Sequence, residues 1–401
     1  MAYLPLANIL HHKLRSLLNA LGIGIGICML LTLSGLSRGS LGEIADRWDA
    51  VNAQLLVYPA GWGESTPTLS GVGLSDRFAQ RIEQQNPGKV ARAVPVFLWP
   101  MKVGGQDHLA AGVDPGQWDM LAGGKKLSGG RLFDPDMSFA HWLEKQLLEE
   151  ASGDDLASIT DADLASRGAL ELVIDSRLAK KASLKVGDDV HISNHNWKIV
   201  GVVPEGGLAR VYLPRRTAQF LFGSGSITKS TVIFVDLVDD EGVEQASRDI
   251  RNDTRQEVVQ VSQYRNMLQQ KWGVMYTYVD AVNVVALIIA FLFIAVMLYT
   301  MVLQRTREIA LLKSFGASSA FVIRQVLAES LLMTFAGCAI GIGVSYAAGW
   351  AIEQVTLYTV TIGPHWIAIA IAAAFAGAVI SACYPAWRAM KIDMVEALTM
   401  E

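Results

Sequence analysis

The sequence lacks the short motifs by which many nucleotide-hydrolysing and metal-dependent enzymes are identified. No G-x-x-x-x-G-K-[ST] phosphate loop occurs, and the stretch GGKK at 123–126 does not have its spacing. H-E-x-x-H and C-x-x-C are absent as well. We therefore expect a chain that is not an enzyme, does not hydrolyse ATP by itself and binds no metal or cofactor of its own.

Cysteine is scarce, and none lies in the polar middle of the chain. The 3 cysteines among 401 residues are Cys28, Cys338 and Cys383, each inside an apolar run. A disulfide framework in residues 38–274 is thereby excluded, whichever compartment holds them. The net charge of −4 at pH 7 gives no indication of a nucleic-acid partner.

Four long runs contain no charged residue: 16–37, 281–304, 330–352 and 366–387. At about 1.5 Å per residue, a helix of this length crosses the roughly 30 Å hydrocarbon core of a bilayer. With 51% hydrophobic residues and a mean hydropathy of +0.31, the whole chain is too polar to lie entirely in a membrane. The prediction is a membrane α-helical protein with four transmembrane helices and a large soluble domain inserted between the first and second.

A cleaved signal peptide is an alternative for the first run, because Lys13 and Arg15 precede it. The run is longer than the apolar core of most signal peptides, and no small-x-small cleavage site stands before a polar start. We interpret 16–37 as the first transmembrane helix.

Lysine and arginine are distributed unevenly among the segments that connect the four runs. They occur in 1–15, 305–328 and 388–401, whereas the segment 353–365 has neither. By the positive-inside rule, the two termini and 305–328 face the cytoplasm of an inner membrane, and residues 38–274 face the periplasm.

Residues 38–274 have the pattern of an α/β domain, which we expect to consist of two subdomains. Apolar runs at 53–59, 90–103, 211–214 and 230–238 predict strands. Within 169–207 we expect a strand, a short helix, a turn and a hairpin at Asn194–Asn196, and the charged stretch 141–167 favours helix. The polar segments 38–51 and 262–280 are predicted to continue the first two transmembrane helices outward as a stalk.

Two patterns that could mark a catalytic or metal site have simpler explanations. Gly35-Leu36-Ser37-Arg38-Gly39 fits the G-x-S-x-G of a nucleophile elbow, but a membrane helix precedes it where a strand is required. His191 and His195 lie in a strand-and-turn segment without a third ligand nearby in the sequence, so we expect a surface hairpin there.

Small residues in the third run predict close helix packing. Gly337 and Gly341 are four positions apart, a spacing that lets two helices approach closely in lipid. The alternative is incidental glycine, because membrane helices are rich in it. The charged residues Asp280, Glu329 and Glu353 lie at the ends of runs, which argues against an ion-coupled transporter.

The segment 307–318, REIALLKSFGAS, resembles the cytoplasmic loop of the MacB/FtsX-like ABC transporter permeases. The family pattern is roughly R-E-I-G-L-L-R-A-L-G-A-S, and Ala310 stands where glycine is common. Three other segments resemble the same family: 14–26, 172–203 and the tail 384–398. Met394 replaces the usual proline of that tail.

The pattern of 305–315 predicts a short amphipathic helix on the cytoplasmic face, with Ile309, Leu312 and Phe315 on one stripe. Gly316 would end this helix and Ser318 would cap the next. In the family this segment is a coupling helix that docks in a groove of a separate ATPase; otherwise it is an ordinary interfacial helix. The resemblance gives ATPase-coupling roles to Arg307, Glu308, Leu311, Leu312, Lys313, Phe315 and Gly316.

The resemblance implies a permease that transmits ATP-driven motion to its periplasmic domain, a mechanism called mechanotransmission. It implies a pair of permease chains and a cytoplasmic ATPase dimer that holds ATP and Mg²⁺. A periplasmic adaptor, an outer-membrane duct or a lipoprotein would complete the assembly. Export of a peptide, antibiotic or toxin is the favoured task; lipoprotein release and regulation of cell-wall hydrolases are alternatives within the family. A membrane-anchored sensor without an ATPase, or a membrane-tethered hydrolase, are alternatives outside it.

Overall fold

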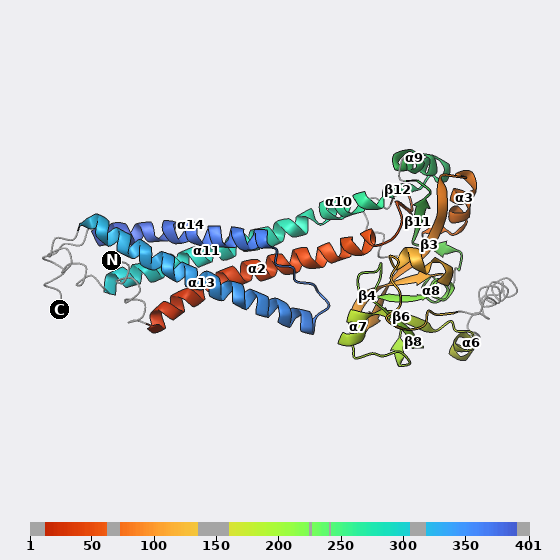
Figure 1. Cartoon of the computed structure of the whole chain (residues 1–401), viewed down its shortest axis with the longest axis horizontal. Helices are drawn as coiled ribbons and strands as arrows, with labels where there is room; N and C mark the ends of the chain where they lie inside the picture. Colours follow the sequence, from red (N-terminus) through yellow and green to blue (C-terminus); the bar gives the residue numbers. More distant parts are fainter. Residues whose placement is uncertain are drawn as a thin grey trace. The chain divides into compact units, whose positions relative to one another are not determined.

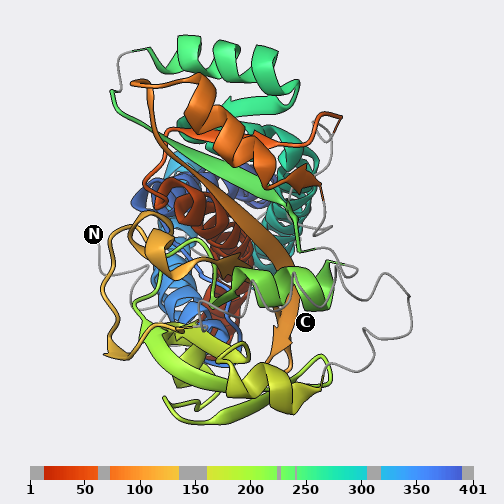
Figure 2. The same ribbon diagram turned by 90° about the vertical axis from the view of Figure 1, so that its right-hand side faces the viewer.

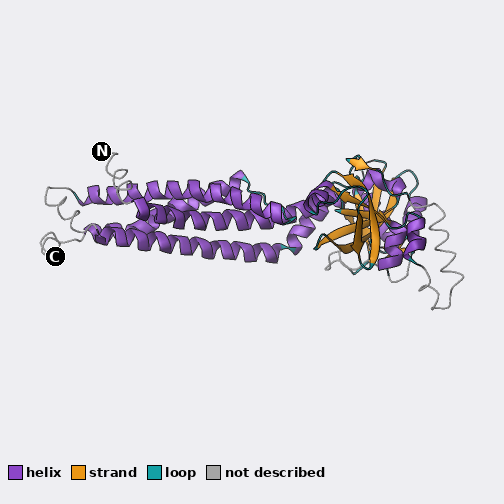
Figure 3. Ribbon diagram, turned by 90° about the horizontal axis from the view of Figure 1, so that it is seen from below, coloured by secondary structure: helices purple, strands orange, loops and turns teal. Residues whose placement is uncertain are grey.

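The computed structural model describes residues 13–61, 73–134, 160–223, 227–239, 242–304 and 318–390. The chain divides into two compact units, which Figure 1 colours along the sequence. The helical unit comprises Met1–Gly42 and Gly273–Glu401, and the α/β unit comprises Glu43–Trp272. In the part of the chain that the structure describes, all strands belong to the α/β unit (Figure 3).

Four long helices build the helical unit: α2 (Lys13–Asp49), α11 (Gly273–Gln304), α13 (Ser319–Val355) and α14 (Pro364–Met390). Among the described residues, three stretches are long and apolar enough to cross a membrane: Ser16–Asp49, Ile323–Val355 and Pro364–Ser381. In α11 the stretch so characterised, Gly273–Ile289, is shorter. The membrane character of the unit is therefore supported, whereas the count of four transmembrane helices stays a prediction.

The helices extend beyond the uncharged runs from which they were predicted. Helix α13 begins at Ser319, so Glu329 lies inside the helix with only 3% of its surface exposed, not at its border. The reason is that a charge ends an apolar run but does not break a helix. Ser318 caps α13 as predicted, since its hydroxyl accepts a hydrogen bond from the Phe321 amide at 3.3 Å.

Helices α2 and α13 approach closely at glycines. A Cβ atom on Gly337 would lie 2.7 Å from Cβ of Ile23, and one on Gly341 would lie 2.7 Å from the Gly24 carbonyl oxygen. No larger side chain fits at either position unless the helices separate. Apolar side chains of α2, α13 and α14 form a shared core around this contact: Ile23, Ile27, Leu30, Leu31, Met333, Cys338, Ala370 and Ala374.

The predicted stalk is continuous on one side and interrupted on the other. As predicted, α2 continues past residue 38 and ends at Asp49. The second stalk segment is instead two helices, α10 (Val261–Lys271) and α11, with a turn at Trp272. Gly273, which has a low helix propensity, follows that turn.

The α/β unit is built on one ten-stranded sheet of order β12-β1-β11-β3-β4-β9-β6-β8-β5, with β7 paired to β8. Its strands are β1 (Leu55–Tyr58), β3 (Val90–Val103), β4 (Gln106–Val113), β5 (Gly129–Gly130), β6 (Glu171–Asp175), β7 (Asp189–Ile192), β8 (His195–Val203), β9 (Val211–Pro214), β11 (Val232–Leu237) and β12 (Glu257–Gln260). A separate pair joins β2 (Leu74–Ser75) to β10 (Lys229–Ser230).

Strand β3 belongs to both halves of this sheet. Its first part, Val90–Val96, pairs with β11, and its second part, Phe97–Val103, pairs with β4. The two subdomains expected from the sequence are therefore two halves of one sheet that share a strand.

The shorter helices of the α/β unit are η1 (Pro115–Gln117), α3 (Arg77–Gln85), α4 (Trp118–Leu121), α6 (Asp161–Ser166), α7 (Ser176–Lys181), α8 (Arg215–Phe222) and α9 (Val243–Thr254). Successive side chains of a strand point to opposite faces of a sheet. In β1, Leu55 packs in a core with residues of α3 and α9, whereas Leu56 packs in a second core with Trp48 of α2. The ribbons of α3 (orange) and α9 (green) can be followed in Figure 2. The end of α2 thus lies on one face of this sheet half, opposite α3 and α9.

Most of the predicted strands and the hairpin are confirmed. The run 90–103 coincides with β3, and the hairpin joins β7 to β8 through Ser193 and Asn194. Both turn residues have positive φ, 51° and 67°, as a two-residue hairpin turn with the twist of its strands requires. The helix-prone stretch 141–167 lies largely outside the described residues; α6 is its described part.

Candidate functional site

The last turns of α2 end in a buried cluster of charged side chains. Glu43 and Arg47 are one helical turn apart, and Nη2 of Arg47 lies 2.9 Å from Oε1 of Glu43. Arg47 is 7% exposed, although a charged arginine is rarely buried unless it is paired. The guanidinium must therefore find its partners inside the α/β unit.

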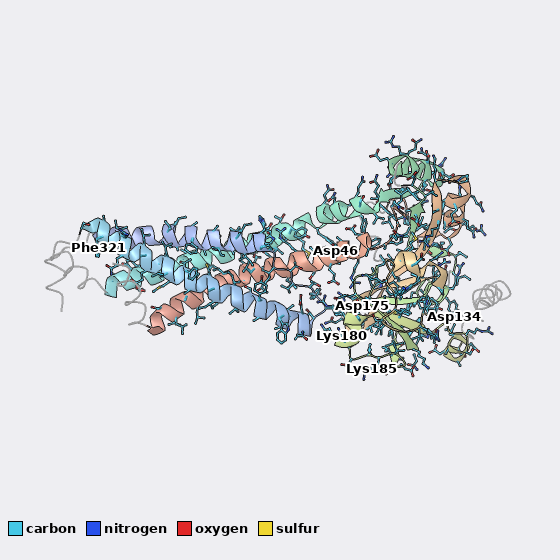
Figure 4. The ribbon with its side chains drawn as sticks, in the orientation of Figure 1. Asp46, Asp134, Asp175, Lys180, Lys185 and Phe321 are labelled. Atoms are coloured by element: carbon cyan, nitrogen blue, oxygen red, sulfur yellow. The ribbon has the colours of Figure 1, made fainter. Side chains whose placement is uncertain are left out.

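Asp175 is the second carboxylate of this cluster. It is completely buried at the end of β6, and its Oδ2 lies 3.3 Å from Nη2 of Arg47 (Asp175 is labelled in Figure 4). Its other oxygen accepts a hydrogen bond from the Leu178 amide at 2.6 Å, which makes Asp175 the N-cap of α7. One side chain thus connects α2, β6 and α7.

The loop between β8 and β9 completes the cluster. Gly207 accepts a hydrogen bond from Nη1 of Arg47 at 2.9 Å through its carbonyl oxygen. Arg210 reaches both carboxylates, at 2.5 Å from Oε1 of Glu43 and 3.3 Å from Oδ2 of Asp175. We call this set the α2 ion cluster; its members are Glu43, Arg47, Asp175, Arg177 and Arg210.

Three arginines and two carboxylates meet in the α2 ion cluster, so the charge of each ion is set against several neighbours. Burial lowers the pKa of the Arg210 guanidinium, and the neighbouring charge of Arg47 lowers it further. Burial and Arg47 also lower the pKa of Lys125, whose ammonium group donates to the Glu205 carbonyl at 2.7 Å. Removal of Arg47 would take one partner from Glu43, one from Asp175 and the donor from the Gly207 carbonyl, and loss of one partner is the costly way to break a buried ion cluster.

An aromatic contact joins the end of α2 to α10. The rings of Trp48 and Tyr264 are 4.5 Å apart between centroids, and Phe234 of β11 lies 5.7 Å from Trp48. All three side chains are buried, with at most 1% of their surface exposed. Both stalk segments therefore enter the same hydrophobic core, where ring pairs add to the energy of area burial.

Tyr212 makes the α/β unit sensitive to high pH. Burial raises the pKa of its phenol to about 12, and the hydroxyl accepts a hydrogen bond from the Ala209 amide at 3.1 Å. The folded state therefore holds the proton more tightly than the unfolded state, in which the pKa is about 10. We expect stability to fall as pH rises from about 10 to about 12. Denaturant titrations across this window should show a weaker dependence in Tyr212→Phe; an unchanged slope would contradict the assignment.

The structure places the other candidate residues as follows. The residues with predicted ATPase-coupling roles, Arg307, Glu308, Leu311, Leu312, Lys313, Phe315 and Gly316, lie outside the described residues. His191 hydrogen-bonds Asn196 at 2.9 Å, and His195 hydrogen-bonds Asp161 at 2.6 Å, so the two rings have separate partners. No group of three or more metal-ligating side chains occurs within the described ranges.

Sequence reasoning missed the α2 ion cluster. Glu43 and Arg47 carried a signal, since their spacing places both on one face of the predicted stalk helix. Asp175 carried another, because an aspartate between a strand and a short helix is a typical N-cap. Nothing local showed that these two signals belong to one site, because Arg47 and Asp175 are 128 positions apart.

Comparison with known families matches both units. The family described as MacB-like periplasmic core domain matches residues 16–253, and the family described as FtsX-like permease C-terminal matches residues 281–394. The chain belongs to the MacB/FtsX-like family of ABC transporter permeases. The α/β unit is accordingly its periplasmic domain, and both matched segments are permease domains.

Relatives of this permease are distant but extend over its whole length. The macrolide export ATP-binding/permease protein MacB 2 of Aeromonas hydrophila is 25% identical and covers 100% of the chain. The chain spans 60% of that protein's length. The ABC transporter permease YknZ of Bacillus subtilis is 20% identical, with 99% of the chain and 98% of YknZ covered.

Two solved structures resemble part of the chain. The periplasmic region of MacB from Actinobacillus actinomycetemcomitans is 16% identical and covers 55% of this chain and 95% of its own, with a TM-score of 0.35. The extracellular domain of YknZ is 14% identical and covers 52% of this chain and 98% of its own, with a TM-score of 0.33.

Proposed function

We propose that this permease transmits ATP-driven motion from a separate cytoplasmic ATPase dimer to its periplasmic domain. ATP and Mg²⁺ are bound by the ATPase, since this sequence has no phosphate loop. Four transmembrane helices place both termini and the segment 305–328 in the cytoplasm, and two permease chains pair in the inner membrane. No cargo crosses between the helices in this proposal.

The observation that carries the proposal is the unbroken helix α2. It runs from Lys13 to Asp49, so one helix contributes residues to both units. Its last turns are fixed in the periplasmic domain by the α2 ion cluster and by Trp48. A helix held by buried ion pairs and buried rings cannot turn or slide alone, because displacement would separate those partners. Motion of α2 therefore has to reach the sheet.

Export is the task that we favour. The relative from Aeromonas hydrophila is named for macrolide export, and a relative from Pseudomonas fluorescens is named for pyoverdine export. We infer cargo handling in the periplasm, with an adaptor and an outer-membrane duct as partners. Lipoprotein release remains the second candidate, because its machinery would use the same coupling between helix and domain.

The proposal is tested by association with the ATPase. Membranes that contain the full-length permease are solubilised, and the permease is captured through an affinity tag. The co-purified ATPase is then quantified with and without a non-hydrolysable ATP analogue. Glu308→Ala and Phe315→Ala should each reduce the captured ATPase by about tenfold, since a few anchor residues dominate such interfaces. Lys185→Ala, an exposed residue of the periplasmic domain, serves as the control and should leave capture unchanged.

The result also separates this proposal from a sensor that works without an ATPase. If no nucleotide-hydrolysing protein is captured by the unaltered chain under either condition, the permease role in an ATP-driven cycle is wrong. If capture occurs but neither variant reduces it, the coupling helix lies elsewhere in the chain.

A further inference from the structure

The G-x-S-x-G segment at the end of the membrane part of α2 has a role that the proposed function does not account for. Gly35 and Gly39 are one turn apart, and both are buried against the loop that joins α13 to α14. A Cβ atom on Gly35 would lie 3.2 Å from side-chain carbons of Val360 and Ile362. A Cβ atom on Gly39 would overlap the backbone of Thr359. The loop therefore lies directly on the helix backbone.

Hydrogen bonds hold this loop in place on both sides. The Thr361 amide donates to the Gly35 carbonyl oxygen at 3.0 Å, and the Ser40 hydroxyl donates to the Thr359 carbonyl oxygen at 3.4 Å. On the α13 side, the Val360 amide donates to Oε1 of Glu353 at 3.0 Å. The bond to Gly35 needs close approach of two backbones, which only residues without a bulky side chain permit.

Arg38, between the two glycines, connects α2 to the other two helices of the unit. Its guanidinium lies 3.3 Å from Oδ1 of Asp280 in α11. The same group lies 4.2 Å from the centroid of the Trp366 ring in α14 and 5.3 Å from that of the Tyr276 ring in α11. Stacking on aromatic faces together with an ion pair is a geometry that arginine supports and lysine does not reproduce.

One turn deeper in the unit, a buried polar contact supports the same arrangement. The Asn283 amide donates to the Ser34 hydroxyl at 2.8 Å, and both side chains are at most 9% exposed. Ser34 and Arg38 are a helical turn apart on α2, as are Asp280 and Asn283 on α11. Two successive turns of α2 are thus joined to α11 by polar groups where apolar contacts would allow sliding.

We propose that Gly35–Gly39 is a positioning junction that ties α2 to α11, to α14 and to the α13–α14 loop, so that the four move as one body. The glycines seat the loop, and Arg38 holds the two helices. This inference rests on the proposed function, because the junction positions α2 for transmission. It assigns a mechanical role to a segment that otherwise resembles a nucleophile elbow.

The chain offers a matched control on the same helix. A Cβ atom on Gly42 would meet no atom within 4 Å, whereas one on Gly39 would overlap the loop. Gly39→Ala and Gly42→Ala therefore make the same change in helix propensity, but only the first displaces the loop. Arg38→Lys keeps the charge and removes the planar stacking group.

The first experiment measures whether the loop is seated. Ser40→Cys is introduced into the full-length permease in lipid nanodiscs, and its rate of modification by a membrane-impermeant maleimide is recorded. We expect Gly39→Ala to accelerate labelling by about tenfold, because the loop that covers position 40 is displaced, and Gly42→Ala to leave the rate unchanged. Equal labelling rates in the two glycine variants would contradict the proposal that Gly39 holds the α13–α14 loop against α2.

The second experiment measures transmission. A fluorophore on Lys185→Cys in the periplasmic domain reports ATP-dependent change in the complex with the ATPase, and hydrolysis is recorded in parallel. We expect the ratio of signal amplitude to hydrolysis rate to fall about fivefold in Gly39→Ala and Arg38→Lys, and to be unchanged in Gly42→Ala. An unchanged ratio in the first two variants would overturn the junction as a transmission element. If the unaltered complex gives no ATP-dependent signal, the proposed function fails, while the labelling result still decides whether the loop is seated.

Discussion

Replacing Arg47 with methionine is expected to lower the free energy of unfolding of the periplasmic domain by about 3–5 kcal/mol. Methionine keeps much of the side-chain volume but leaves the completely buried Asp175 with Arg210 and without its partner on α2, and the Gly207 carbonyl without its donor. Removal of one member of a buried network of ion pairs and hydrogen bonds is among the most destabilising changes in a folded domain. Denaturant titration of the full-length protein in detergent, followed by circular dichroism, measures the change.

Two further variants make this prediction specific to the α2 ion cluster. Arg177→Met removes a cation that is partly exposed and 3.8 Å from Glu43, so it should cost less than Arg47→Met. Combining Arg47→Met with Asp175→Asn should recover part of the loss, because the charge is gone and asparagine still caps α7. If the Arg47 and Arg177 variants lost the same free energy of unfolding, the contacts of Arg47 would not be what fixes α2 in the periplasmic domain.

Trp48→Ala is expected to have the second large effect, a loss of about 3–5 kcal/mol together with loss of transmission. The substitution opens a cavity between α2, α10 and the sheet, where Trp48 contacts Tyr264 and Phe234. With that side chain gone, the ring contact between α2 and α10 is lost. Stability is measured by thermal unfolding, and transmission by the ATP-dependent signal from a fluorophore at position 185.

Trp197→Ala provides the control for a general loss of stability. Trp197 is also completely buried, but it lies in β8 and donates to the Ile192 carbonyl oxygen in the hairpin, away from the stalk contact. We expect a similar loss of stability with the ATP-dependent signal retained in the protein that remains folded. If both tryptophan variants abolish the signal equally, the effect of Trp48 is one of stability alone.

The contacts at the end of α2 and the Gly35–Gly39 junction belong to different units, and each is stabilised by contacts that suit its surroundings. In the periplasmic domain, buried charges and rings fix the end of α2, where water is excluded and unpaired charge is costly. In the helical unit, lipid supplies no hydrophobic driving force between helices, so close backbone approach and polar contacts take that role. Helix α2 contributes residues to both arrangements without a break.

Much of the local structure could be predicted because its causes are local. The run 90–103 is rich in residues that favour strands, Ser318 is a good N-cap, and Asn194 tolerates the left-handed turn conformation of the hairpin. Strand β4, which contains the polar residues Gln106 and His108, was missed because its burial comes from neighbours in the sheet. Helix α13 extends beyond the uncharged run 330–352, because Glu329 is polar in the sequence but buried in the helix.

By itself, the sequence determined that this protein is a membrane permease with a large α/β domain between its first two helices. The uncharged runs, the short strand patterns and the segment 307–318 carry that information. Each of these signals is contained in a short stretch of the sequence. The tertiary structure alone decided which charges and glycines matter. Arg47 meets Asp175, and Gly39 meets Thr359, only because the chain brings together positions far apart in sequence. The local sequence determines where each helix or strand forms. The burial of a side chain and the close approach of two backbones depend on neighbours that are distant in the sequence.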